Sequence, residues 1–250
     1  MCLGARLVGL YLYGSITAGG FDADISDLDL LVVIRTAMSA REFDDLKKLH
    51  EDIVRDYPQW KDRLDVAYLP ARALQTFKTE KTRITTISPG DPFEWKEAGY
   101  DWLINWHEVR RHGVTLFGPS PKDIIAPVSR EEFIDAIKAQ AGDWREWIRV
   151  SRERSRGFHA YAVLTMCRSL YACEFGEQVS KQKAAAWAKE ELPEWSSHID
   201  NALQTRTAPI RHEVDSAATF PETSRFVNFV IDKIQSATGE EPSTIKGGPR

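Results

Sequence analysis

The sequence has few cysteines and no long apolar run. Its three cysteines, Cys2, Cys167 and Cys173, are an odd number without a C-x-x-C pair, which indicates a reducing compartment and no metal-binding thiols. No run of 18 or more apolar residues and no signal peptide is present, so neither a membrane span nor export is expected. We therefore expect a cytoplasmic protein with no membrane partner.

The chain also lacks an excess of positive charge. Its 33 Lys and Arg stand against 37 Asp and Glu, which gives a net charge of −4. This balance disfavours a general nucleic-acid binder and suits a cationic or neutral small substrate. We expect a monomer with no nucleic-acid partner.

The first half of the chain alternates between strand and helix patterns. Strands are expected at 7–13, 27–34, 63–69, 82–87 and 114–117, and helices at 40–56 and 101–112. Strands interleaved with helices make this half α/β or α+β.

A proline-rich linker at 118–127 separates this half from an all-helical one. A capping box at Ser129 and Glu132 opens the first helix of the second half. Further helices are expected at 158–175, 180–192, 193–203 and 221–237. We predict a domain at 1–120, a helical bundle at 128–237 and a flexible, Gly- and Pro-rich tail at 238–250.

The glycines at 14–20 do not form a familiar nucleotide loop. Gly14-x-x-x-x-Gly19 is followed by Gly20-Phe21 rather than Lys-Ser, and there is no G-x-G-x-x-G, so a Walker A loop and a dinucleotide fold are both excluded. The acidic stretch that starts at Asp22 lacks the Gly and Glu of an EF-hand at its sixth and twelfth positions.

The most informative pattern is Gly14-Ser15, followed by Asp27-Leu28-Asp29 at the head of a five-residue apolar run. Side chains repeat every two residues on a strand, so Asp27 and Asp29 point to one face. Two like charges there need a cation, for which Mg²⁺ with a nucleoside triphosphate is the usual answer. Gly14 permits close backbone approach and Ser15 offers a hydroxyl to phosphate. This predicts a phosphoryl or nucleotidyl transferase with Asp27 and Asp29 as metal ligands.

Three further residues carry open alternatives. Asp65, on the expected strand 63–69, could ligate the metal or take the proton of an attacking hydroxyl. Arg168, on an apolar helix face, lies either at a cleft or with a buried stem and a paired head group. Lys181, in the first turn of a helix, opposes the helix dipole unless a phosphate binds there.

These motifs together resemble a known family. Gly-Ser followed by Asp-hydrophobic-Asp-hydrophobic is similar to the nucleotidyltransferase superfamily signature. The stretches Val163–Arg168, Ser180-Lys181, Ala185–Ala188 and Leu192-Pro193 resemble aminoglycoside adenylyltransferases of the streptomycin/spectinomycin type. The resemblance implies an α+β protein, with an N-terminal nucleotidyltransferase (polymerase β-like) mixed-sheet domain and a C-terminal all-α helical bundle.

The resemblance also implies a reaction: Mg²⁺-dependent transfer of AMP from ATP to a hydroxyl of an aminoglycoside or aminocyclitol antibiotic, with release of pyrophosphate. The implied triphosphate and magnesium residues are Ser15, Ser26, Asp27 and Asp29. Asp65 matches the catalytic carboxylate, and Asp101 matches an acid of the substrate cleft. Arg168 and Lys181 match contacts to the nucleotide phosphates.

Two positions depart from the family. Asp65 stands where the family has Glu, and Phe229 stands where it has a nucleotide-contacting Tyr. These two positions leave open a non-catalytic nucleotide-binding module. A separate alternative is a nucleotidyltransferase that acts on a protein or on another small-molecule acceptor.

Overall fold

The computed structural model describes residues 3–152, 154–207 and 216–236. The chain divides into two compact units, 1–136 with 178–182, and 137–177 with 183–250. The domain limits expected from the sequence, 1–120 and 128–237, stay a prediction. The expected tail at 238–250 lies outside the described residues.

The first unit is built on a six-stranded sheet with the order β5-β4-β3-β2-β1-β6. Its strands are β1 (Leu7–Tyr13), β2 (Leu28–Ile34), β3 (Leu64–Pro70), β4 (Thr82–Ile87), β5 (Glu94–Ala98) and β6 (Val114–Phe117). Strands β2 and β3 pair in parallel, and the other neighbours pair antiparallel. The sheet is therefore mixed, as expected for the first half of the chain.

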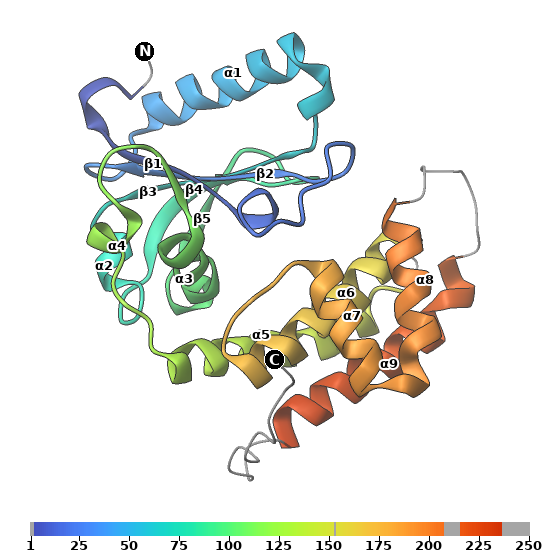
Figure 1. The fold of residues 1–250 in the computed structure, drawn as a ribbon. Coiled ribbons are helices and arrows are strands. Elements are labelled where there is room, and N and C mark those ends of the chain that lie inside the picture. The colour runs from blue at the N-terminus through green and yellow to red at the C-terminus, as the bar shows by residue number, and fades with distance from the viewer. Residues whose placement is uncertain (1–2, 153, 208–215, 237–250) are drawn as a thin grey trace. The chain divides into compact units, whose positions relative to one another are not determined.

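Helices lie on both faces of this sheet (Figure 1). Helix α1 (Ala40–Asp56) covers one face; α2 (Ala73–Thr76), α3 (Leu103–His112) and α4 (Pro121–Ile124) lie on the other. A capping box between Ser39 and Glu42 starts α1, which packs Leu46 into a core with Val32 and Val66. Burial of such side chains stabilises the fold by roughly 1.5–3 kcal/mol each.

Strand β5 is the one strand of the described sheet that the sequence did not predict. Three of its five residues, Glu94, Lys96 and Glu97, are charged, so no alternating apolar pattern marks it. It lies at the edge of the sheet, where charged side chains are common because they discourage pairing with other chains.

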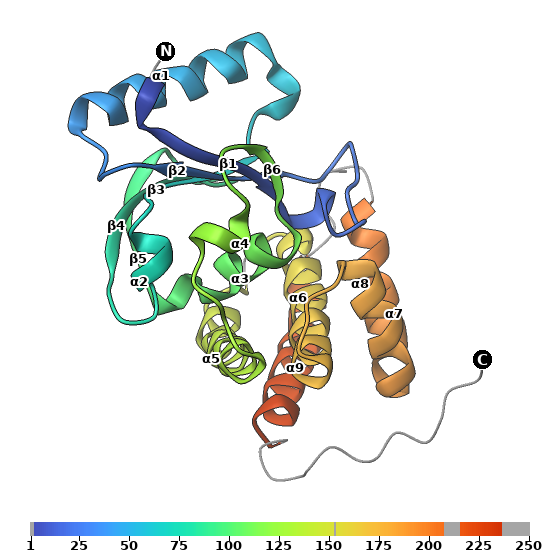
Figure 2. The same cartoon turned by 60° about the vertical axis from the view of Figure 1, so that its left-hand side comes forward.

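The second unit is helical. Helix α5 (Arg130–Arg149) begins in the first unit and ends in the second; the other helices are α6 (Arg156–Phe175), α7 (Lys181–Glu191), α8 (Ser196–Thr207) and α9 (Ser216–Ser236). Helix α6 packs against α8 and α9 (Figure 2). The α+β class with a helical second half is thus confirmed, although α9 begins five residues before the expected Pro221. Within the described residues, every helix is too short or too polar to cross a membrane.

A buried histidine makes the first unit sensitive to acid. His50 of α1 is 5% exposed, and its Nε2 lies 2.8 Å from the Tyr68 hydroxyl. Burial lowers the pKa of His50 to about 4. Between its ordinary pKa and this value, the unfolded chain takes up a proton that the folded chain does not. The free energy of unfolding therefore falls as the pH drops through this window.

We expect His50→Gln to flatten this pH dependence. The slope of the free energy of unfolding between about pH 4 and pH 6.5 should decrease by up to about 1.4 kcal/mol per pH unit. Urea unfolding at several pH values measures the slope, and His112→Gln, at an exposed histidine of α3, is the matched control. An unchanged slope in His50→Gln would contradict the expectation.

Candidate active site

Three carboxylates meet where β2 and β3 begin. Asp27 directly precedes β2, and Asp29 and Asp65 are the second residues of β2 and β3. Asp29 lies opposite Asp65 in the parallel register, so both side chains point to the same face. The charge of Asp27 acts on both of the others. The structure therefore brings together the three acids that the sequence predicts.

The three acids are electrostatically unfavourable when all of them are ionised. Burial, followed by the charges of Asp65 and Asp27, raises the pKa of Asp29 to about 7. The pKa of Asp65 is also raised, first by burial, although a hydrogen bond from Ser88 opposes this. A bound cation would relieve the repulsion by favouring the ionised carboxylates.

The Gly14-Ser15 turn packs directly against Asp29. Gly14 adopts a left-handed φ of +71°, and a Cβ at this position would lie 2.0 Å from Asp29 Oδ2. The Ser15 N–H donates a hydrogen bond to the Asp29 carboxylate. The loop then closes with a 3.0 Å bond from the Gly20 N–H to the Ser15 carbonyl. Glycine is required here because any side chain would displace the acid.

Lys181 lies in the same unit as these acids. Residues 178–182 belong to the first unit, and a Cβ added to Gly20 would lie 2.7 Å from the Cβ of Ser180. Lys181, the first residue of α7, is close enough for its charge to lower the pKa of Asp29. The glycine loop, the acids and this lysine therefore lie close together in the first unit.

The Ser26 side chain forms a hydrogen bond within the loop that leads to β2. Its hydroxyl accepts a 2.9 Å hydrogen bond from the Asp22 N–H, and the side chain is buried. Arg63 donates from Nε and Nη2 to the Ser26 carbonyl at 3.1 and 2.6 Å, and from Nη2 to the Ala23 carbonyl at 2.7 Å. Arg63 therefore holds this loop in place, although it stands in no motif by which the sequence could have indicated it.

Two other predicted residues lie on other elements: Asp101 caps a turn of the first unit, and Arg168 belongs to the second unit. Asp101 is exposed in the turn before α3, where its Oδ1 accepts a 2.9 Å bond from the Gly99 N–H. Arg168 is half-buried on α6 and belongs to the second unit. The substrate role of Asp101 and the nucleotide role of Arg168 stay predictions.

Three neighbours of the acids also stand in no motif of the sequence. Tyr13 is buried opposite Asp29 on β1 and forms a side-chain hydrogen bond with Asn105 of α3. Ser88 Oγ donates to Asp65 Oδ1 at 3.0 Å. Ser88 directly follows the expected strand 82–87, so pairing of that strand with 63–69 could have indicated it. No pattern marks Asn105.

Known proteins match this chain over nearly its whole length. Residues 123–233 match a family model described as the C-terminal domain of aminoglycoside adenylyltransferase. An aminoglycoside (3'') (9) adenylyltransferase of Klebsiella pneumoniae is 26% identical over 256 residues, which cover 94% of this chain and 90% of the relative. The chain is therefore similar to aminoglycoside adenylyltransferases along most of its length. These relatives are enzymes of the adenylyltransferase class.

Two further matches agree with this family. A spectinomycin 9-adenylyltransferase of Staphylococcus aureus is 25% identical over 215 residues, covering 76% of this chain and 74% of the relative. The crystal structure of a spectinomycin adenyltransferase from Enterococcus faecialis with ATP and spectinomycin has a TM-score of 0.74, covers 94% of each chain and is 15% identical. At that identity the structural match shows a shared fold.

The donor set at the three acids fits Mg²⁺. Among the described residues, no group of three or more His, Cys, Asp or Glu side chains forms a metal site by itself. Mg²⁺ usually binds through one or two carboxylates and completes its shell with waters and substrate phosphates. Burial and, after it, the charges of Asp65 and Asp27 raise the pKa of Asp29, and such a cation would offset both effects. Asp27 and Asp29 are the residues that would hold it.

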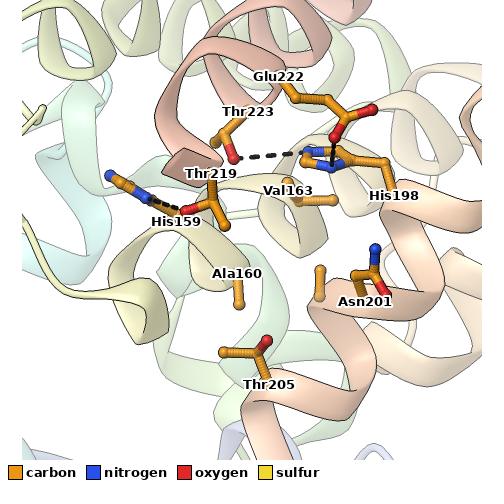
Figure 3. A pocket seen from close by; sticks show the side chains of 10 residues that line it. His159, Ala160, Val163, His198, Asn201, Thr205, Thr219, Glu222 and Thr223 are labelled. Atoms are coloured by element: carbon orange, nitrogen blue, oxygen red, sulfur yellow. Dashed lines mark hydrogen bonds and ion pairs between the residues drawn. The ribbon is translucent and has the colours of Figure 1, made fainter. Parts of the chain in front are cut away.

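A separate small pocket lies between α6, α8 and α9 of the second unit (Figure 3). Its volume is about 70 Å³, which is room for two or three water molecules. The ring nitrogens of its two histidines are engaged by neighbours. His198 Nδ1 lies 3.3 Å from Glu222 Oε2, and His159 Nδ1 lies 3.0 Å from Thr219 Oγ1. We assign these side chains to the packing of the three helices.

Alanine at Gly14 should cost far more stability than alanine at Gly19. Both glycines have left-handed φ angles, +71° and +70°, but a Cβ at Gly19 meets no atom within 4 Å. Gly19→Ala should therefore cost about 1 kcal/mol, the left-handed penalty alone. Gly14→Ala should cost at least about 2 kcal/mol more, because it also displaces Asp29. Urea unfolding compares the two variants, and equal losses would contradict the packing of Gly14 on Asp29.

Proposed function

We propose that this chain transfers AMP from Mg²⁺-bound ATP to a hydroxyl of an aminoglycoside or aminocyclitol antibiotic and releases pyrophosphate. The observation that carries the proposal is the meeting of Asp27, Asp29 and Asp65 beside the Gly14-Ser15 turn. The antibiotic class is supported by the names of the relatives, which are aminoglycoside and spectinomycin adenylyltransferases. A monomer in the cytoplasm stays a prediction.

Asp27 and Asp29 would hold the metal, and the turn beside them would hold phosphate. When bound, Mg²⁺ neutralises phosphate charge and stabilises the charge that develops during transfer. The Ser15 hydroxyl would donate to a phosphate oxygen, while the Ser15 N–H is directed to Asp29. Lys181 would add a positive charge toward the triphosphate, because its charge already reaches Asp29.

Asp65 would accept the proton of the acceptor hydroxyl. As the hydroxyl oxygen bonds to the α-phosphorus, the bond from that phosphorus to the bridging oxygen breaks and pyrophosphate leaves. Ser88 occupies Oδ1 of Asp65, so Oδ2 is the oxygen left to take the proton. The net charge of −4 favours approach of a cationic antibiotic.

Pyrophosphate release tests the proposal directly. The purified chain would be incubated with ATP and Mg²⁺ together with streptomycin, spectinomycin and other aminoglycosides in turn, with EDTA and acceptor-free controls. Release that needs both Mg²⁺ and an antibiotic would support the proposal. Release only with a protein or with another small-molecule acceptor would show that the acceptor is not an antibiotic. ATP binding without any release would indicate a nucleotide-binding module instead.

Asp29→Asn should abolish turnover and yet stabilise the unliganded protein. Asp29 holds its proton more tightly in the folded chain, with a pKa of about 7, so its contribution to stability is lost as the pH rises toward 7. At about pH 8 the neutral amide should therefore raise the free energy of unfolding by about 1–2 kcal/mol, a value reduced for partial exposure.

Asp24→Asn provides the matched control for this variant, because Asp24 is an exposed acid of the loop that leads to β2. It should change neither urea unfolding nor pyrophosphate release. Turnover retained by Asp29→Asn would refute the metal role of Asp29. A less stable Asp29→Asn protein would refute the repulsion between the acids.

Lys181→Met should weaken ATP binding, whereas Lys183→Met should not. The Lys181 charge reaches Asp29, whereas Lys183 Nζ lies 5.8 Å from the centre of the Tyr171 ring. We expect the dissociation constant of Mg²⁺-ATP, measured by titration calorimetry, to rise at least about ten-fold for Lys181→Met. Equal effects of the two substitutions on the dissociation constant would contradict a specific role of Lys181 in binding the triphosphate.

A further inference from the structure

Asp65 is held between two neighbouring strands. It faces Asp29 of β2 on one side. On the other side, the antiparallel pairing of Val66 with Ile87 brings Ser88 beside Asp65. Ser88 Oγ donates to Asp65 Oδ1 at 3.0 Å. The proposed proton acceptor thus has one oxygen fixed by a neighbouring hydroxyl.

A rigid turn holds Ser88 itself. The Asp91 N–H donates to the Ser88 carbonyl at 2.9 Å, and Gly90 has a φ of +83°. With Pro89 before it, Gly90 gives the Pro-Gly pattern of a type II turn, in which proline restricts the first central residue and glycine permits the second. Ser88 is the first residue of this turn, so its main chain has little freedom.

The same turn also places a positive charge near Asp65. Asp91 Oδ2, at the last position of the turn, lies 3.2 Å from Lys96 Nζ. Glu94 Oε1 lies 3.1 Å from the same ammonium, and the Lys96 charge acts on Asp65. One turn and the strand after it therefore supply both a hydroxyl and a cation to the carboxylate.

We propose that Ser88 is the positioning residue for Asp65. Its hydroxyl fixes the plane of the carboxylate through Oδ1 and directs Oδ2 toward the acceptor hydroxyl. The inference rests on the proposed function, because it takes Asp65 as the proton acceptor. An unrestrained carboxylate would spend part of its time rotated away, which lowers the rate of the chemical step more than it weakens binding.

The kinetic test compares Ser88→Ala with Ser88→Thr. Ser88→Ala should lower kcat by about ten-fold to a hundred-fold, while the KM values for ATP and for the antibiotic stay within about two-fold. Ser88→Thr keeps the hydroxyl and should recover most of kcat. Ser120→Ala removes a serine hydroxyl that caps α4 and should leave kcat unchanged. An unaltered kcat in Ser88→Ala, or equal losses in the alanine and threonine variants, would overturn the inference.

A structural readout keeps the inference independent of turnover. High-resolution crystal structures should show Asp65 in one rotamer in the unsubstituted protein and in Ser88→Thr, and in more than one rotamer in Ser88→Ala. A single unchanged rotamer in Ser88→Ala would overturn the inference even if no acceptor is turned over. Absence of turnover in the unsubstituted protein, with the rotamers as expected, would count against the proposed function alone.

Discussion

The repulsion among Asp27, Asp29 and Asp65 is the constraint on which the site depends. Parallel pairing of β2 with β3 places Asp29 and Asp65 side by side, and partial burial denies them the full screening of water. The pKa of Asp29 rises to about 7 as a result. A fold under selection for stability alone would not keep three acids there. Their presence is best explained by a ligand that brings positive charge with it.

The glycine loop and the acids form one structural feature rather than two. Gly14 has no side chain because Asp29 occupies the space where its Cβ would lie, and the Ser15 N–H helps to keep Asp29 ionised. Gly20 in turn permits the close approach of Ser180. The groups proposed to bind phosphate and the groups proposed to bind metal are therefore fixed relative to each other by these close contacts. This matters because transfer of a phosphoryl group depends on positioning more than on covalent chemistry.

The sequence predicts elements that carry strong periodicity and residues that lie in recognisable motifs. Strand β1 is a short apolar run, β4 is rich in the β-branched residues Thr and Ile, and α1 has helical apolar spacing. Asp27, Asp29 and Asp65 each stand in a strand-like context. Strand β5 was not predicted, because its charged residues interrupt the apolar alternation that marks a strand. Arg63 escaped because its contacts are to carbonyl groups of a loop more than 35 residues away in the chain, and such contacts leave no local trace in the sequence.

The environment of Asp65 shows why residue type alone does not decide its competence. Aspartate has one rotatable bond fewer than the glutamate that the family resemblance leads one to expect at this position. Its carboxylate therefore lies closer to the strand, where a hydroxyl just beyond the end of the neighbouring strand β4 can reach it. Ser88 does reach it at 3.0 Å, and the turn that begins at Ser88 also orders Lys96 through Asp91. The shorter side chain of aspartate extends less far toward the acceptor hydroxyl. It also needs fewer contacts to fix its orientation, because one hydrogen bond leaves it few alternative rotamers. The departure from the family at this position is thus compatible with catalysis, provided that the acceptor hydroxyl approaches Oδ2 closely.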